Sequence, residues 1–311
     1  MLEEKKKALK PLYKKWQVMK SRINNSFIYY LLWGLVGVLF FPVFSILYRQ
    51  RWDALGYTHA YFILPVSLGM VYWKRKELAG AFASTEKRFD VSSLLILIFG
   101  GLMYLFGWRQ DYMVISTFAL IPFLYGFAGF IYGKKVQRLL LFPILYLLLL
   151  VPPPFALLDR VTLPLRYISA FGVEKIFGLF NFPIQREGLM YVVKGQQMMI
   201  DEACSGFRSL ITMMSLGLVY VYVIRSSIIK KAVLVLSIIP LAVMGNILRV
   251  IVISLIGVYF GQEMAQGFLH YFSGVVIFLF IVLGFAGIEA VWTRRERRGM
   301  RNDEEEFEWF E

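Results

Sequence analysis

Long apolar runs separated by short polar segments dominate the pattern of the chain. A run of about 17–25 apolar residues is long enough to cross the hydrocarbon core of a membrane as a helix. Eight candidate runs occur, at about 27–48, 57–73, 91–107, 112–132, 137–152, 203–224, 230–259 and 267–292. The pattern therefore predicts an all-α polytopic membrane protein with about eight transmembrane helices.

Two regions depart from this simple alternation. The seventh run is about 30 residues long and contains Pro240 and a Gly-Asn pair, so it is either one long kinked helix or a helix with a broken outer half. The first part of segment 153–202 is apolar but interrupted, which predicts interfacial or re-entrant helices before the sixth span. Its last part alternates polar and apolar residues around a Lys-Gly turn. This alternation predicts a short β-hairpin at about 189–193 and 196–200.

The polar ends of the chain define its predicted domain organisation. Residues 1–26 form a basic cytoplasmic arm, and residues 293–311 form a charged cytoplasmic tail. Between them, residues 27–292 form one transmembrane domain, in which 153–202 is the large extracytoplasmic segment.

Composition and charge agree with a membrane location. The chain is 58% hydrophobic, whereas a soluble globular domain is nearer 45–50% apolar. If the N-terminus is cytoplasmic, 24 of the 34 Lys and Arg lie in cytoplasmic segments, eight lie outside, and Arg208 and Arg249 lie within spans. This bias explains the net charge of +13 without a nucleic-acid partner. We therefore expect a multi-pass protein of the cytoplasmic (inner) membrane, in contact with lipids, with both termini cytoplasmic.

The single cysteine, Cys204, limits the chemistry that the chain can perform. One thiol excludes an internal disulfide and a multi-thiolate zinc site. The two histidines and Cys204 do not have the spacing of a metal motif, so we expect neither a metal nor another cofactor.

Three chemically distinctive residues share one predicted depth. Cys204 begins the sixth span, Arg249 lies near the outer end of the seventh, and His270 begins the eighth. Each has an ordinary interpretation by itself, as a buried small hydrophobe, a snorkelling cation or an interfacial side chain. Their common depth, and the cost of placing a charge within a span, favour a functional site that faces outside. His59 also begins a span at this boundary.

The residues around Cys204 favour a thiolate. Asp201 is the predicted N-cap, which places Cys204 in the first turn of a helix. Helix N-termini and nearby cations stabilise a thiolate, and Arg208 lies four residues further on. Glu202 is positioned to hold one of the arginines.

The same residues carry a resemblance to a known family. EACSGFRSL, followed by NILRV at 246–250 and GFLHYFSG at 267–274, resembles the exosortase/archaeosortase family of membrane transpeptidases. YTHAYFILPVSLGMVYWKRKEL at 57–78 resembles an early segment of that family, although Ala60 stands where Gly is usual. The resemblance covers roughly residues 50–290.

The resemblance implies a membrane cysteine peptidase or transpeptidase. In its terms Cys204 is the nucleophile, His270 the acid and base, and Arg249 the group that stabilises the oxyanion. The candidate supporting residues are Arg208, Glu202, Asn246 and His59. The implied partners are exported proteins of the PEP-CTERM type, with a C-terminal signal made of a short Pro-containing motif, a hydrophobic helix and a basic tail. The acceptor nucleophile stays open.

Two other classes of function are compatible with parts of the pattern. An acyltransferase or another membrane enzyme would use the same thiol. An anion transporter would use Arg208 and Arg249 to line a path, but it would give Cys204 no role. The residues alone also do not rank His270 above His59, or Arg249 above Arg208.

Overall fold

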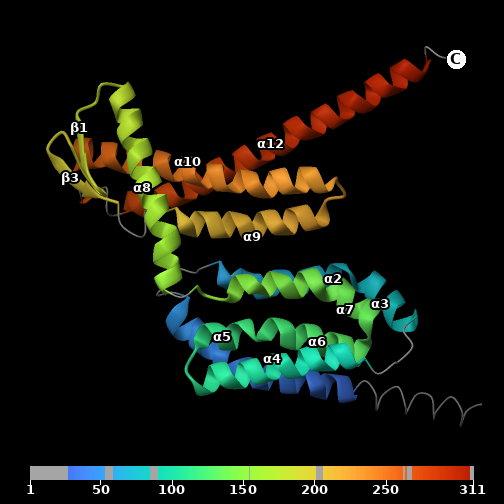
Figure 1. Ribbon diagram of the computed structural model, residues 1–311. Coiled ribbons are helices and arrows are strands. Elements are labelled where there is room, and N and C mark those ends of the chain that lie inside the picture. Colours follow the sequence, from blue (N-terminus) through green and yellow to red (C-terminus); the bar gives the residue numbers. More distant parts are fainter. Residues whose placement is uncertain are drawn as a thin grey trace, which may run out of the picture. The chain divides into compact units, whose positions relative to one another are not determined.

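The computed structural model describes most of the chain, and its elements are mainly helices (Figure 1). The described residues are 27–52, 59–84, 90–153, 155–200, 206–261, 263–264 and 268–308. The predicted N-terminal arm lies outside them. The chain divides into two compact units: residues 1–55 with 75–144 form the first, and residues 56–74 with 145–311 form the second.

Five helices among the described residues are long and apolar enough to cross a membrane. They are Phe27–Gln50, Val91–Arg109, Met113–Tyr132, Ile228–Phe260 and Gly274–Arg298. The prediction of a helical polytopic membrane protein is therefore confirmed. The other three predicted runs form shorter elements, namely α2 (Ala60–Trp73), α9 (Phe207–Val223), and α7 (Lys134–Tyr146) followed by the 3-10 helix η2 (Leu147–Leu150).

Close packing of two helices organises the first unit. Gly100 of α4 (Val91–Arg109) faces the backbone of Phe123 in α6 (Leu120–Tyr132), and Gly126 of α6 faces the backbone of Leu97 in α4. A Cβ at either glycine would lie 2.7 Å from the facing Cα, so glycine permits this approach. This unit also contains the helix Phe27–Gln50, whose end overlaps η1 (Leu47–Arg51), together with α3 (Arg75–Ser84), α5 (Met113–Phe118) and most of α7. All seven candidate site residues belong to the second unit.

Three helices form one core of the second unit (Figure 1). α9, α10 (Ile228–Phe260) and α12 (Phe268–Glu308) contribute buried side chains to the same cluster, with Met213 from α9, Ile238 from α10, and Ile281 and Phe285 from α12. α10 runs antiparallel to both of its neighbours. The core therefore fixes the level of each helix along the others.

α10 is one continuous helix, although Pro240 lies inside it. The alternative of a broken outer half is therefore wrong. Its 33 residues correspond to about 50 Å, whereas the hydrocarbon core of a bilayer is about 30 Å thick. The C-terminal part of α10 uses this extra length to pack against the sheet and α8.

The segment before α9 contains a three-stranded antiparallel sheet with strand order β1-β2-β3. β2 (Met190–Val193) and β3 (Gln196–Met199) correspond to the two strands of the predicted hairpin. The pattern does not predict β1 (Ile184–Glu187), which pairs with β2 and makes the hairpin part of a larger sheet. β1 is only four residues long and follows Pro183, so its local signal is weak.

A single long helix precedes the sheet, where the sequence predicts several interfacial or re-entrant helices. α8 (Phe155–Leu179) has 25 residues and continues through Pro164. The charges that interrupt its apolar sequence pair locally or with the sheet: Arg166 Nη2 lies 3.7 Å from Asp159, and Arg186 of β1 donates to Glu174 at 2.7 Å. The charged residues in this apolar segment are therefore polar positions within one continuous helix and do not separate shorter helices.

A second buried cluster joins α8, the sheet and the C-terminal half of α10. It contains Val173 of α8, Tyr191 of β2, Ile200 after β3 and Val250 of α10. The hydroxyl groups of Tyr191 and Ser254 in α10 are also hydrogen-bonded at 2.7 Å. The sheet is therefore fixed on the part of α10 that carries Arg249.

Candidate active site

The structure describes the predicted site residues to different extents. Cys204 and Glu202 lie outside the described residues. The backbone of His270 belongs to the first turn of α12, but its side chain is not among the described parts of the structure. The side chains of four candidates are described, those of His59, Arg208, Asn246 and Arg249.

α9 begins at Phe207, later than predicted. Its N-cap is Gly206, whose φ of +74° lies in the left-handed region that favours glycine. The predicted N-cap at Asp201 and the predicted first-turn position of Cys204 lie outside the described residues. Arg208 lies within the first turn of α9.

Gly206 packs against Asn246 of α10. A Cβ on Gly206 would lie 2.8 Å from Asn246 Cβ and 2.9 Å from Asn246 Cγ. Asn246 is 2% exposed, and its Nδ2 donates a hydrogen bond to Ser169 Oγ of α8 at 2.8 Å. The beginning of α9, the middle of α8 and the face of α10 therefore meet at Asn246.

The two described residues that flank the Cys204 segment, Ile200 and Gly206, are both packed. On one side, Ile200 is 1% exposed in the cluster that includes Val250, and its N–H donates to Leu189 O at 3.0 Å. On the other side, Gly206 contacts Asn246. Ile200 and Gly206, the described residues that flank the Cys204 segment in the sequence, therefore both pack on the same helix, α10.

Arg249 lies on the same stretch of α10, three residues after Asn246. Residues three apart are neighbours on a helix surface, so Arg249 and Asn246 share a face. Arg249 is half-buried and its Nε is buried, whereas Arg208 is exposed. The sequence does not decide which arginine is more important for the site. In the structure the side chain of Arg249 is the more buried of the two.

The antiparallel packing of α10 and α12 relates the backbone of His270 to Arg249. Near one end of the pair, Lys230 Nζ of α10 donates a hydrogen bond to Thr293 Oγ1 of α12 at 2.8 Å. Arg249 lies 19 residues after Lys230, and Gly274 lies 19 residues before Thr293. His270 precedes Gly274 by four residues, about one turn. The backbone of His270 therefore lies within about one turn of the level of Arg249.

His59 has a different setting. It precedes α2 and is 5% exposed, and its carbonyl oxygen accepts a hydrogen bond from Phe62 N at 3.0 Å. α2 packs on η2 in the second unit. The burial of this imidazole favours a role in packing at the beginning of α2.

Sequence reasoning did not identify Ser169. Its hydroxyl accepts the hydrogen bond from the buried Asn246 amide, and it is itself 1% exposed. A lone serine within an apolar helix gives no local signal of this role, because its partner lies 77 residues away in the sequence.

The Gly206 contact leads to a first testable prediction. Gly206→Ala should destabilise the protein by about 2–4 kcal/mol, because it adds left-handed strain and a clash with Asn246. Gly188→Ala is the matched control, since Gly188 has φ +63° but nothing within 4 Å of an added Cβ. We expect it to cost only the strain, about 1–2 kcal/mol.

Chemical unfolding of the purified variants measures this difference, and iodoacetamide labelling reports on Cys204 directly. Only Gly206→Ala should change the labelling rate of the single thiol, because only that variant displaces the chain beside it. Equal effects of the two substitutions on stability and labelling would show that the Asn246 contact does not position the Cys204 segment.

Comparison with known proteins places this arrangement in a family. Residues 52–287 match the family model described as transmembrane exosortase. The matched range includes Cys204, Arg249, His270 and His59. No significant match was found among curated proteins, and none among solved structures. Because the match covers well over half of the 311 residues, the chain belongs to the transmembrane exosortase family.

Proposed function

We propose that this multi-pass membrane protein is a cysteine transpeptidase or peptidase that cleaves the C-terminal sorting signal of exported proteins. The observation that carries the proposal is that Ile200 and Gly206, which flank Cys204 in the sequence, pack against the part of α10 that bears Arg249. Family membership supports the same chemistry, because exosortases act on substrates with sorting signals. The proposed substrate signal has a short Pro-containing motif, a hydrophobic helix and a basic tail.

The proposed topology has eight spans, with both termini on the cytoplasmic side of the inner membrane. The bias of Lys and Arg toward alternate loops supports it. Segment 153–202 then lies outside, and the site faces outside as well. The hydrophobic helix of the substrate docks among the spans while its basic tail stays in the cytoplasm, which places the scissile motif near Cys204.

This topology predicts that reporters fused at Arg225 and at Glu263 lie on opposite sides of the membrane. Arg225 follows α9, and Glu263 follows α10, so one complete membrane-length helix separates the two positions. Alkaline phosphatase should be active only at Glu263, and green fluorescent protein should be fluorescent only at Arg225. Reporters on the same side would overturn both the eight-span topology and the common depth of the site.

The proposed mechanism has two steps. The Cys204 thiolate attacks the scissile carbonyl carbon, and Arg249 stabilises the negative oxygen of the tetrahedral intermediate. His270 donates a proton to the leaving amine as the C–N bond breaks, which leaves a thioester on Cys204. His270 then takes a proton from an amine, another acceptor or water, whose attack releases Cys204 as thiolate.

The contrast between the two arginines gives a prediction for this mechanism. Arg249→Lys should reduce processing by roughly 10²–10³-fold, because an ammonium does not reproduce the planar fork of donors held in a half-buried position. Arg208→Lys should cost only a few-fold, since Arg208 is exposed and its charge is retained. The measurement is the rate of conversion of a substrate that carries the sorting signal.

The control for this comparison uses labelling instead of turnover. Arg208 is assigned mainly to favouring the thiolate, so Arg208→Gln should move the pH profile of iodoacetamide labelling of Cys204 to higher pH. Arg249→Gln should leave that profile nearly unchanged. A shift in Arg249→Gln alone would mean that the two roles are exchanged.

Trapping the thioester tests the proposed function itself. The full-length protein is incubated with a substrate that carries the sorting signal, quenched in acid, and digested for mass spectrometry. We expect the N-terminal product of the substrate to be attached to Cys204, and the adduct to be released by hydroxylamine. A fatty acyl group on Cys204 would instead identify an acyltransferase, and the absence of any adduct during turnover would exclude covalent catalysis.

A further inference from the structure

An apolar notch lies on the surface of α12. It has a volume of about 450 Å³, within the range of about 300–1,000 Å³ that is typical of small-ligand sites. Its lining residues are Gly284, Gly287, Ile288, Val291, Trp292 and Arg295. The notch is separate from the proposed catalytic residues, since it begins 14 residues after His270 on α12.

Two glycines of the notch show which way it faces. Gly284 packs on α10, where an added Cβ would lie 2.7 Å from Leu241 Cδ2. At Gly287, by contrast, an added Cβ would meet nothing within 4 Å, and Val291 is 55% exposed. These residues belong to the membrane-length helix Gly274–Arg298. The notch therefore opens on a side of α12 that does not pack on α10.

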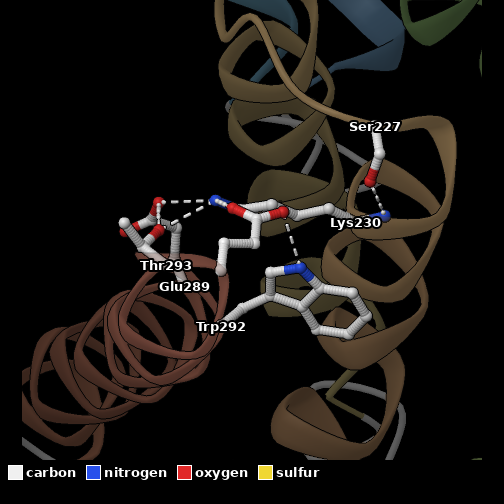
Figure 2. A network of polar contacts seen from close by, with 6 residues as sticks. Ser227, Lys230, Glu289, Trp292 and Thr293 are labelled. Atoms are coloured by element: carbon white, nitrogen blue, oxygen red, sulfur yellow. Dashed lines mark hydrogen bonds and ion pairs between the residues drawn. The ribbon is translucent and has the colours of Figure 1, made fainter. Parts of the chain in front are cut away.

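A polar network around the buried Lys230 holds the indole that lines the notch (Figure 2). Trp292 Nε1 donates to Glu296 Oε1 at 2.9 Å, and Glu296 Oε2 pairs with Lys230 Nζ of α10 at 3.2 Å. Lys230 is 5% exposed and also contacts Thr293 at 2.8 Å and Glu289 at 3.4 Å. The indole is thus fixed before any ligand arrives, and both carboxylates are engaged with Lys230.

Positive charge gathers at one end of the notch. Arg295 lines it, and Arg294, Arg297 and Arg298 are exposed in the same two turns of α12. A cluster of arginines directly beyond the apolar part of a membrane helix attracts anionic lipid headgroups, and tryptophan is enriched at the same depth. The notch therefore offers an apolar slot that ends at an anion-binding position.

We propose that the notch binds one anionic phospholipid of the surrounding leaflet. One acyl chain lies along Gly287 and Val291 against the Trp292 indole, and the phosphate accepts hydrogen bonds from Arg295. A second copy of α12 would bring the same four arginines against themselves, and a substrate with a basic tail would be repelled by them. This inference does not depend on Cys204 or on the proposed reaction.

Native mass spectrometry tests the proposal. The full-length protein is delipidated in detergent and then titrated with phosphatidylglycerol or with phosphatidylcholine. Wild type should retain one phosphatidylglycerol and bind phosphatidylcholine at least about fivefold more weakly. Arg295→Gln should weaken phosphatidylglycerol binding about fivefold, whereas Arg297→Gln, which removes the same charge outside the notch, should change it less than twofold.

Gly287→Leu provides a steric test of the apolar slot. Leucine should fit the fold, because the space beside Gly287 is open, but it should fill the notch and reduce phosphatidylglycerol binding tenfold or more. Gly34→Leu is the matched control, since an added Cβ there also meets nothing within 4 Å. Equal retention in all variants, or equal binding of the two lipids, would overturn the proposal. Loss of a dimer in Gly287→Leu would instead identify the notch as an interface between copies.

Discussion

Cys204→Ala should abolish processing of a sorting-signal substrate, with a loss on the order of 10⁴-fold or more. Cys204 supplies the only thiol in the chain, so its removal deletes the covalent path and no neighbouring thiol replaces it. The measurement is the conversion of a tagged substrate in membranes that contain equal amounts of wild-type or variant protein.

Two controls keep this result interpretable. Cys204→Ala should insert into the membrane at the wild-type level and unfold at nearly the same denaturant concentration. Cys204→Ser should also fail to support normal processing, although a hydroxyl can retain traces of activity. If Cys204→Ala processes substrate at near-wild-type rates, the covalent mechanism is wrong.

The helical part of the fold follows directly from the apolar pattern. Burial in lipid requires each backbone polar group to be paired within its own segment, so long apolar runs become helices wherever they occur. This reasoning predicts α4 and α10 to within a few residues. It does not predict the exact helix ends: α10 begins two residues before its apolar run and ends one residue after it.

The beginning of α9 shows how a contact with another helix sets a helix end near the site. Asp201 satisfies the preference for an acidic N-cap, and by sequence alone it is the better candidate. Asp201 lies outside the described residues, and the N-cap of α9 is Gly206, with a backbone conformation that glycine tolerates and a contact with Asn246 in another helix. The partner of Gly206 lies 40 residues further along the chain, so the information that sets this helix end is tertiary.

The sequence predicted the reactive residues of the candidate site, but it did not predict the residues that hold the surrounding helices and sheet together. The positions of Cys204, Arg249 and His270 along their helices were enough to propose a common depth. Ser169, Tyr191 and the strand β1 carry no comparable signal, because a serine or a tyrosine in an apolar segment has many ordinary environments. Their hydrogen bonds and packing hold the sheet and α8 on α10.

The two histidines should differ strongly when each is replaced. His270→Ala should reduce processing nearly as much as Cys204→Ala, by roughly 10²–10⁴-fold, because it removes the proposed proton donor to the leaving amine and the base for the second step. His59→Ala should reduce processing only partly. The structural reason is that His270 lies within about one turn of the level of Arg249, whereas His59 is buried at the beginning of α2.

The unfolding midpoint and the pH dependence of processing distinguish a packing role from a catalytic role for the two histidines. His59→Ala should lower the unfolding midpoint of the protein, since it empties a site that is 5% exposed, and His59→Gln should restore part of that loss. His270→Ala should leave the midpoint nearly unchanged and should flatten the pH dependence of the processing rate, because the titrating group is gone. The reverse ranking of the two variants in turnover would assign the acid and base to His59. It would also mean that the packed position of α2 changes when substrate binds, since the buried imidazole would then have to reach the scissile bond.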